Sequence, residues 1–368
     1  SFLYLPLADE ARGGQYALPW EKEPGVVVGE WARRQSADAP ARTVAAAKSW
    51  LCHSRVDRHQ PILPWNAPDD VKKISPVDAS RRILEHLARA WNHARPESPF
   101  KDQKVVLTIP ASFDASAREL THEAALAAGL PKDFVLLEEP QAAVYSWLAD
   151  HGENWRKQLK EGDTLLVSDI GGGTTDFTLI RVESEQGGLV LRRQAVGDHI
   201  LVGGDNMDLT LAHLAKSAFD AQGVHIDAWQ SVALWHSCRA AKEAILAEQG
   251  AETHSVAILG RGSKLIGGTV STELRRETVA QTLLEGFFPR CAPDAQPARK
   301  RASGFREMGL PFESDTAITR HLASFLRRHG ENGAPARPTH ILYNGGVLKS
   351  PLLRARLTEV ISGWFGGQ

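Results

Sequence analysis

A short segment near the middle of the chain combines two carboxylates with a run of glycines. It reads Asp169-Ile170-Gly171-Gly172-Gly173-Thr174-Thr175-Asp176, so the carboxylates flank the three glycines. Because glycine has no Cβ, the backbone N–H groups of such a turn can approach an anion closely. Two carboxylates would repel a phosphate, but they suit a hydrated Mg²⁺ that carries phosphates on its other side. The segment therefore predicts a magnesium–phosphate site, and the plainer alternative is a hairpin with a glycine turn and surface aspartates.

Two other phosphate-binding patterns do not fit this segment. A dinucleotide-binding glycine turn opens a helix, whose N-terminus takes the pyrophosphate. Here the turn leads into Thr174–Ile180, a run typical of a strand. No glycine loop ends in Gly-Lys-Ser or Gly-Lys-Thr, so a Walker loop is excluded as well.

The elements around the glycine segment alternate between strand and helix. A strand–turn–strand pattern, Thr164–Ile170 and Thr174–Val182, carries the glycines. Two strand–loop–helix patterns, beginning at Lys104 and at His340, are typical of parallel strands, so we expect an α/β fold with two related lobes. The other expected strands are residues 2–5, 26–28, 104–109, 134–137, 188–195 and 340–343, and the expected helices are residues 43–51, 81–94, 115–128, 142–148, 206–221, 228–248, 315–328 and 352–361.

Composition limits the class of protein. The 368 residues are 42% hydrophobic, which is enough for a sizeable core. Lys and Arg number 43 against 44 Asp and Glu, and the net charge of −1 gives no global attraction to nucleic acid or to an anionic membrane. No apolar run approaches the ~18 residues of a membrane span. We therefore expect neither nucleic acid nor a membrane as a partner.

The cysteines and one basic run add little chemistry. Cys52, Cys238 and Cys291 are widely spaced, which indicates buried thiols in a reducing cytoplasm and neither disulfides nor a zinc site. The run Arg299-Lys300-Arg301 is short, and we expect a solvated loop there.

Six segments spread along the chain share one resemblance. Beside Asp169–Asp176 they are Gly29-Glu30 with Ala32–Arg34 and Lys48; Ile109–Asp114 with Arg118, Ala124, Gly129 and Leu130; Glu139–Ala143; Gly197-Asp198 with Gly203–Asp208; and Gly345–Pro351. In this order they resemble the Hsp70 chaperones of the actin–hexokinase–Hsp70 ATPase superfamily, and Asp169–Asp176 is similar to the second phosphate loop of that family. Gly345–Pro351 is similar to its adenosine loop, Gly-Gly-Ser-Thr-Arg-Ile-Pro. The similarity runs from about residue 26 to residue 361 and is weakest across 250–339.

The resemblance implies an actin-like ATPase fold, an α/β architecture of two lobes. Each lobe would be built on a mixed sheet flanked by helices, with a nucleotide cleft between the lobes. Residues 1–97 would form the peripheral subdomain of lobe I, and residues 98–160 its incomplete core subdomain. Residues 161–204 with 273–368 would form the core subdomain of lobe II, and residues 205–272 its peripheral subdomain.

The resemblance also implies a role for each matching position. Lys48 would contact the γ-phosphate and the attacking water, and Glu139 would order that water and the magnesium shell. Asp169 and Asp176 would hold Mg²⁺ through its water, and Thr174 would hydrogen-bond the γ-phosphate. The implied cofactors are ATP or ADP with Mg²⁺, and the implied nucleotide contacts are Gly171, Gly172, Gly173, Thr174, Gly203, Gly204, Asp205, Lys242, Gly345, Gly346 and Lys349.

The chain departs from the family at the adenine end. On the helix that carries Lys242, Arg239 stands where the family has Glu, Glu243 where it has Arg, and Leu246 where it has Ser. Arg239 and Glu243 are spaced to pair with each other along the helix. Arginine stacking on adenine is lost, and Lys349 in place of Arg weakens it further. Nucleotide affinity and base preference therefore stay open.

Other family segments have no match in this chain. They are the first phosphate loop, Asp-Leu-Gly-Thr-Thr-Asn, the final helix of the nucleotide-binding domain, and the peptide-binding domain. The chain runs from Ser1 to Gln368, and we expect it to be a piece of a longer protein that hydrolyses ATP poorly when isolated.

Three functions are compatible with these patterns. The first is the nucleotide-binding domain of an Hsp70-like chaperone, which in the complete protein hydrolyses ATP to ADP and phosphate to drive a conformational cycle. The second is a non-hydrolysing scaffold or regulator, and the third is a small-molecule kinase of the same superfamily. The first function implies a J-domain co-chaperone, a nucleotide-exchange factor and unfolded-protein clients as partners.

Overall fold

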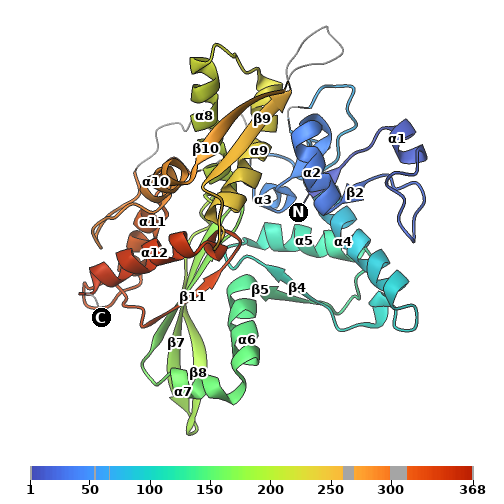
Figure 1. The fold of residues 1–368 in the computed structure, drawn as a ribbon. Helices are drawn as coiled ribbons and strands as arrows, with labels where there is room; N and C mark the ends of the chain where they lie inside the picture. The colour runs from blue at the N-terminus through green and yellow to red at the C-terminus, as the bar shows by residue number, and fades with distance from the viewer. Residues whose placement is uncertain (1, 54, 66, 260–268, 299–312, 367–368) are drawn as a thin grey trace.

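The strands of the chain divide into two lobes (Figure 1). The structure is a computed structural model that describes residues 2–53, 55–65, 67–259, 269–298 and 313–366. Among these residues, lobe I holds a three-stranded and a two-stranded sheet, and lobe II holds a four-stranded sheet and a separate two-stranded hairpin. The two lobes expected from the strand–loop–helix patterns are therefore present.

Lobe I is built on two small sheets. In the first, β1 lies between β2 and β3 and is antiparallel to both. In the second, β4 and β5 are parallel, as predicted from their strand–helix–strand pattern. The elements are β1 (Phe2–Tyr4), α1 (Ala8–Arg12), β2 (Val27–Val28), α2 (Glu30–Asp38), η1 (Pro40–Arg42), β3 (Thr43–Ala45), α3 (Ala47–Leu51), α4 (Pro76–Ala94), η2 (Phe100–Asp102), β4 (Val106–Ile109), α5 (Ala115–Ala127) and β5 (Val135–Glu138), followed by α6 (Glu139–His151), η3 (Gly152–Asn154) and α7 (Trp155–Gln158).

The helix predicted over residues 43–51 is wrong in its first half. Residues Thr43–Ala45 pair with β1 as strand β3, which buries Val44 in the core of this sheet. Ala46 then takes the left-handed backbone conformation, with φ 56°, and the helix that carries Lys48 begins only at Ala47. Strand pairing in the folded lobe has overridden the local helical preference.

Two expected burial patterns in lobe I are also wrong. On α4, the predicted apolar face includes Leu87 and Trp91, which are 55% and 39% exposed. On β4, a strand expected to be buried, Val106 is 55% exposed, and Val135 beside it on β5 is 54% exposed. The described residues therefore cover only one face of the β4–β5 sheet, where Leu107 and Leu136 pack against α5.

Lobe II is organised around a four-stranded sheet of order β11-β6-β7-β8. The predicted hairpin is confirmed, because β6 and β7 pair antiparallel, and β11 adds to β6 in parallel. The β9–β10 hairpin stands apart from this sheet (Figure 1). The elements are β6 (Thr164–Ile170), β7 (Thr175–Glu185), β8 (Gly188–Val196), α8 (Gly204–Ala221), α9 (Ala228–Leu246), β9 (Thr253–Leu259), β10 (Thr269–Arg275), α10 (Arg276–Phe287), α11 (Ile318–Arg328), β11 (His340–Asn344), η5 (Val347–Lys349) and α12 (Pro351–Trp364).

Alternate residues of β6 pack into two different cores, because successive side chains of a strand point to opposite faces. Leu166 and Ile170 face the main core, which helices α8 to α12 cover. Leu165 and Val167 face the other side, where α6 and α7 supply Val144 and Trp155. The strand that carries Asp169 near its C-terminal end is thus buried on both faces.

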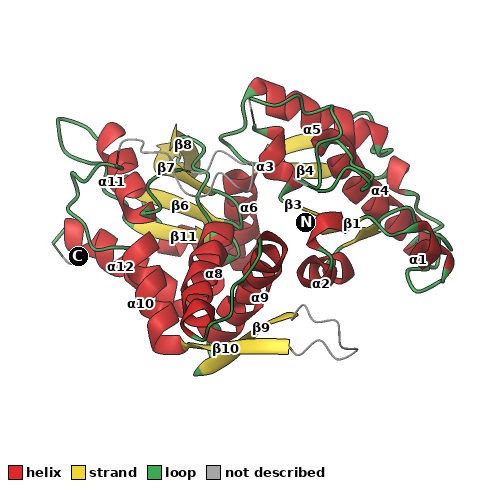
Figure 2. Ribbon diagram, turned by 90° about the horizontal axis from the view of Figure 1, so that it is seen from above, coloured by secondary structure: helices red, strands yellow, loops and turns green. Residues whose placement is uncertain are grey.

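The two lobes meet where α9 faces α2 (Figure 2). Helix α9 belongs to lobe II and lies beside α8, while α2 belongs to lobe I and packs on β1. This boundary brings side chains of the first forty residues against those of residues 233–243.

The remaining expectations concern cysteines, membranes and the basic run. Cys238 is buried as expected, but Cys52 and Cys291 are only partly buried, and all three thiols are free. Among the residues that the structure describes, no helix is long and apolar enough to cross a membrane. The run Arg299-Lys300-Arg301 lies outside the described residues.

Candidate functional site

The two aspartates of the glycine segment face each other at the turn end of the β6–β7 hairpin. Asp169 and Asp176 are directly opposed in the antiparallel register, so their side chains lie on the same face. Both are buried, as is Thr174 just before β7. Buried strands on either side of a tight turn therefore hold two carboxylates next to one another.

The glycine turn between them packs closely on the start of α8 and on lobe I. The carbonyls of Gly171 and Gly172 accept hydrogen bonds from the N–H groups of Gly204 (3.0 Å) and Asp205 (2.7 Å). A Cβ on Gly173 would lie 2.7 Å from Ser49 Oγ, and a Cβ on Gly203 would lie 2.5 Å from the Gly172 carbonyl oxygen. At Gly203 the obstacle is backbone, so only glycine fits there, whereas at Gly173 the Ser49 side chain would have to move.

The same turn keeps backbone donors free. The N–H groups of Gly172 and Gly173 have no hydrogen-bond partner among the described residues. Adjacent unpaired N–H groups in a tight turn form a concave anion-binding surface. The turn therefore has both the close packing and the free donors that a phosphate site requires.

Lys48 and Glu139 come together as the resemblance implies. Lys48 Nζ lies 2.6 Å from Glu139 Oε1, although 91 residues separate them in the sequence. Lys48 is in the short helix α3, and Glu139 is the first residue of α6. The lysine remains half exposed, so its ammonium can reach other groups in the cleft.

Asp169 has an environment that favours a nearby cation. Burial, together with the negative charges of Glu139 and Asp176, raises the pKa of its carboxyl to about 6, although the hydrogen bond from Asn344 and the charge of Lys48 lower it. The Asn344 amide donates to Asp169 Oδ2 at 2.9 Å. A carboxylate held against burial and two like charges is stabilised by a divalent cation.

Magnesium fits this arrangement only through water. Across the described parts of the chain, no three His, Cys, Asp or Glu side chains are grouped to ligate a metal ion directly. Mg²⁺ commonly keeps several of its waters and is held by one or two carboxylates. The pair Asp169 and Asp176 meets that requirement.

Asp176 has two partners that the sequence did not reveal. Its Oδ1 accepts a hydrogen bond from the Ser112 hydroxyl and lies 3.4 Å from His199 Nδ1, and that nitrogen is 2.6 Å from Ser112 Oγ. Burial lowers the pKa of His199, but the bond to Asp176 and the neighbouring Cys52 outweigh burial and bring that pKa to about 10. His199 is therefore a cation at neutral pH and neutralises part of the Asp176 charge.

Ser112, His199 and Asn344 each lie inside or beside a motif segment. Ser112 belongs to Ile109–Asp114, His199 follows Gly197-Asp198, and Asn344 precedes Gly345. Their residue types carried no signal of a role, because each contact depends on how separate segments pack.

A cavity of about 510 Å³ continues from the glycine turn toward α9 and α12. Among its lining residues are the predicted nucleotide contacts Gly172, Gly204, Asp205, Lys242, Gly346 and Lys349. Gly345 lies just beside it with φ +85°, and a Cβ there would sit 2.3 Å from the Ile170 carbonyl oxygen. The structure therefore brings most of the predicted nucleotide residues around one space.

The predicted pairing of Arg239 with Glu243 is wrong. Arg239 Nη2 lies 2.7 Å from Asp205 Oδ1, and its Nε lies 2.7 Å from Asp208 Oδ2. Burial opposes the charge of Arg239, but these two aspartates outweigh burial and raise its pKa. Both aspartates come from α8, which packs beside α9, so two carboxylates on the neighbouring helix replace the one expected on the same helix.

Lys242 and Glu243 are engaged as well. Lys242 Nζ lies 2.6 Å from Asp208 Oδ1 and donates to the Gly204 carbonyl at 2.9 Å. Glu243 pairs with Arg33 of α2 across the lobe boundary. The adenine-side residues of α9 are thus bound to other parts of the protein.

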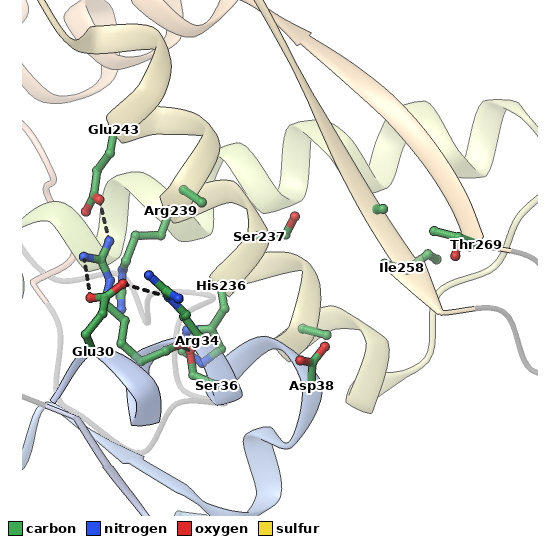
Figure 3. Close-up of a pocket in the computed structure, with 14 residues that line it drawn as sticks. Glu30, Arg34, Ser36, Asp38, His236, Ser237, Arg239, Glu243, Ile258 and Thr269 are labelled. Carbon is green, nitrogen blue, oxygen red and sulfur yellow. Dashed lines mark hydrogen bonds and ion pairs between the residues drawn. The ribbon is translucent and has the colours of Figure 1, made fainter. Parts of the chain in front are cut away.

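A second cavity, of about 640 Å³, lies between α2, α9 and the β9–β10 hairpin (Figure 3). Figure 3 shows Glu30 and Arg34 on α2, and His236 and Ser237 on α9. Arg33, Arg239 and Glu243 line both cavities, so these three side chains stand between the two spaces.

Comparisons with known proteins place the chain in one family. The sequence profile described as "Hsp70 protein" matches residues 17–303, which is most of the chain. The "Chaperone protein HscA homolog" of Bordetella petrii is 31% identical over 277 residues, 72% of this chain and 41% of the relative. The "Chaperone protein HscA" of Proteus mirabilis is 34% identical over 215 residues, 54% of this chain and 32% of the relative. The "Chaperone protein DnaK" of Stenotrophomonas maltophilia is 28% identical over 225 residues, 57% of this chain and 34% of the relative.

The matched region therefore spans less than half the length of each of these relatives. The two lobes, with the β6–β7 hairpin in lobe II, form the actin-like ATPase fold expected from the resemblance. On the family match and this architecture, the chain belongs to the Hsp70 family.

Proposed function

We propose that this chain binds Mg-ATP and Mg-ADP between its lobes, and that the full-length protein hydrolyses ATP to ADP and phosphate to drive a chaperone's conformational cycle. One observation carries the proposal. The Lys48–Glu139 pair of lobe I is among the charges that act on Asp169, which faces Asp176 beside a glycine turn with free N–H donors. A cation, three carboxylates and backbone donors in one cleft are the groups that phosphoryl transfer to water uses.

Each residue has a distinct task in this proposal. Lys48 directs its charge to the γ-phosphate, and Glu139 orients the attacking water. Thr174 and the N–H groups of the glycine turn hold the terminal phosphates. Asp169 and Asp176 would hold Mg²⁺, which neutralises phosphate charge when bound.

The nucleoside lies, in this proposal, in the cavity of about 510 Å³. Gly204 and Asp205 would face the ribose, while Lys242, Gly345, Gly346 and Lys349 would face the adenosine. Gly203 supports the turn from the N-terminus of α8. The proposal includes the four subdomains implied by the resemblance and a cytoplasmic location. Its partners would be a J-domain co-chaperone, a nucleotide-exchange factor and unfolded-protein clients.

The decisive test is phosphate release by the full-length protein. We expect Lys48→Ala and Asp169→Asn to lower turnover by about 100-fold or more, the size of a lost transition-state contact. Lys216→Ala is the matched control, because Lys216 lies exposed on α8 and pairs only with Asp220 among the described residues. Wild-type turnover in Lys48→Ala would refute the assigned role, and a phosphorylated acceptor in place of free phosphate would favour the kinase.

A second function, a non-hydrolysing regulator, has one observation in its favour. Arg239 and Lys242 are occupied by Asp205 and Asp208, so α9 offers a nucleotide fewer free polar groups than its sequence contains. Calorimetric titration separates the two functions. Binding of Mg-ADP by the full-length protein supports the ATPase, and the absence of any nucleotide binding supports the regulator.

A further inference from the structure

The polar side chains that line the 510 Å³ cavity are almost all committed to other protein groups. Arg239 and Lys242 are bound to aspartates of α8, and Glu243 is bound to Arg33. Glu248 and Lys349 also line the cavity, but both are exposed to solvent. A base that enters this cavity therefore meets few polar groups that are both desolvated and free.

Ser350 is the exception. It lines the same cavity, it is only 7% exposed, and its Oγ is buried with no hydrogen-bond partner among the described residues. It precedes α12 as the N-cap residue, yet its side chain makes no capping hydrogen bond. Buried hydroxyls nearly always have a partner, because leaving one unpaired costs free energy. A ligand that enters the cavity can supply this partner.

Two positions on the cavity wall, Leu246 and Ser350, differ from the Hsp70 family in whether they carry a hydroxyl. Leu246 on α9 stands where the family has Ser, and Ser350 stands where its adenosine loop has Ile. Both residues line the cavity, one from α9 and the other from the start of α12. This chain has therefore lost a hydroxyl from one wall and gained one on another.

We propose that Ser350 is the residue that contacts the base in this cavity, and that its hydroxyl lets the site accept adenine and guanine nucleotides about equally. A hydroxyl can donate one hydrogen bond and accept others, so it matches either the amino group of adenine or the carbonyl oxygen of guanine. Leu246, Val347 and Leu353 supply apolar surface on the same cavity, and apolar surface does not distinguish the two purines. This proposal rests on the proposed nucleotide-binding function.

The test compares three ligands by calorimetry on the full-length protein: Mg-ADP, Mg-GDP and Mg-pyrophosphate. In the wild-type protein we expect the two nucleotide affinities to agree within about threefold. Ser350→Ala should weaken both by about three- to tenfold, the range of one hydrogen bond, and leave pyrophosphate unchanged. Ser350→Thr keeps the hydroxyl and should bind like the wild type. Ser217→Ala is the matched control, because that serine lies on α8 and bonds only its own helix among the described residues.

Thermal melts of every variant show whether it is folded. The titrations then distinguish a wrong assignment of Ser350 from a wrong proposed function. Unchanged nucleotide affinity in Ser350→Ala, a wild-type preference above tenfold for one purine, or an equal loss of pyrophosphate binding each overturns the assignment of Ser350. A wild-type protein that binds pyrophosphate but neither nucleotide also overturns it, while leaving the phosphate site intact. A wild-type protein that binds none of the three refutes the proposed function itself.

Discussion

The Arg33 guanidinium on α2 and the Glu243 carboxylate on α9 form an ion pair that joins the two lobes. Arg33 also lies 3.8 Å from Glu30 on its own helix. Both members of the interlobe pair line the cavity of about 510 Å³ and the second cavity, so the pair closes one side of the space proposed for the nucleoside. Nucleotide release that requires the lobes to separate must break it.

Arg33→Gln and Glu243→Gln should each speed the release of bound Mg-ADP by about two- to fivefold. The pair is partly exposed, and exposed pairs contribute about 0.2–1 kcal/mol. Stopped-flow displacement of a fluorescent ADP analogue at low salt measures the rate. In the double variant we expect no further gain, because the two changes remove one interaction. Additive effects would show that the residues act separately.

Asp169→Asn should stabilise the protein without ligand and abolish magnesium-dependent nucleotide binding. The folded pKa of about 6 lies above the ordinary value of 3.8, so the unfolded chain gives up this proton first as the pH rises. Stability therefore falls between about pH 4 and pH 6 and stays lower above that range. We expect the variant to be about 1–3 kcal/mol more stable at pH 7.5, and less so at pH 5. Urea denaturation without Mg²⁺ at the two pH values checks this, and equal stability of the two proteins at pH 7.5 would contradict it.

His199→Asn should destabilise the protein more at pH 6 than at pH 9. The folded pKa of about 10 exceeds the ordinary 6.5, so the contribution of His199 is complete below pH 6.5 and is lost as the pH rises toward 10. Removing a hydrogen bond to a charged partner costs about 1.5–3 kcal/mol at the lower pH. Urea denaturation at both values, with the exposed His225→Asn as control, measures the difference. A loss of stability that does not change with pH would exclude a charged His199.

Gly345→Ala should destabilise the protein by about 1–3 kcal/mol and weaken nucleotide binding. The residue has φ +85°, and a Cβ there would meet the Ile170 carbonyl at 2.3 Å and Asp169 Oδ1 at 2.8 Å. The matched control is Gly363→Ala within α12, where a Cβ meets nothing within 4 Å. A helix is more stable with alanine than with glycine at such a position. The free energy of unfolding of the control should therefore rise by about 0.5–1 kcal/mol. Thermal unfolding of both variants gives the comparison, and a loss in both would point to a general effect of substitution.

The parts of the fold that could be predicted from sequence are those fixed by local pattern. The β6–β7 hairpin follows from two strand-like runs around glycines, and that hairpin alone sets Asp169 opposite Asp176. The prediction of a helix over residues 43–51 was wrong in its first half, because pairing with β1, about forty residues away in the sequence, decides the conformation of Thr43–Ala45.

The candidate site also has a part that could be predicted from the sequence and a part that could not. Only the family resemblance predicted that Lys48 and Glu139 belong to the same site, because no local sequence pattern relates residues 91 positions apart. Arg239 was assigned to its neighbour Glu243 by helical spacing, but the packing of α8 beside α9 offers it Asp205 and Asp208. Ser112 and His199 were missed because their contact with Asp176 exists only after the lobes and loops have assembled.

The hydrogen bond from Ser112 to Asp176 crosses from lobe I to lobe II, since Ser112 follows β4 and Asp176 lies on β7. Hydrogen bonds weaken steeply beyond about 3.5 Å, so a displacement of about 1.5 Å between the lobes breaks this one. The orientation of a carboxylate proposed to hold Mg²⁺ therefore depends on how closely the lobes approach each other. In the proposed cycle, a partner that moves one lobe relative to the other would reorient this carboxylate without contacting the nucleotide.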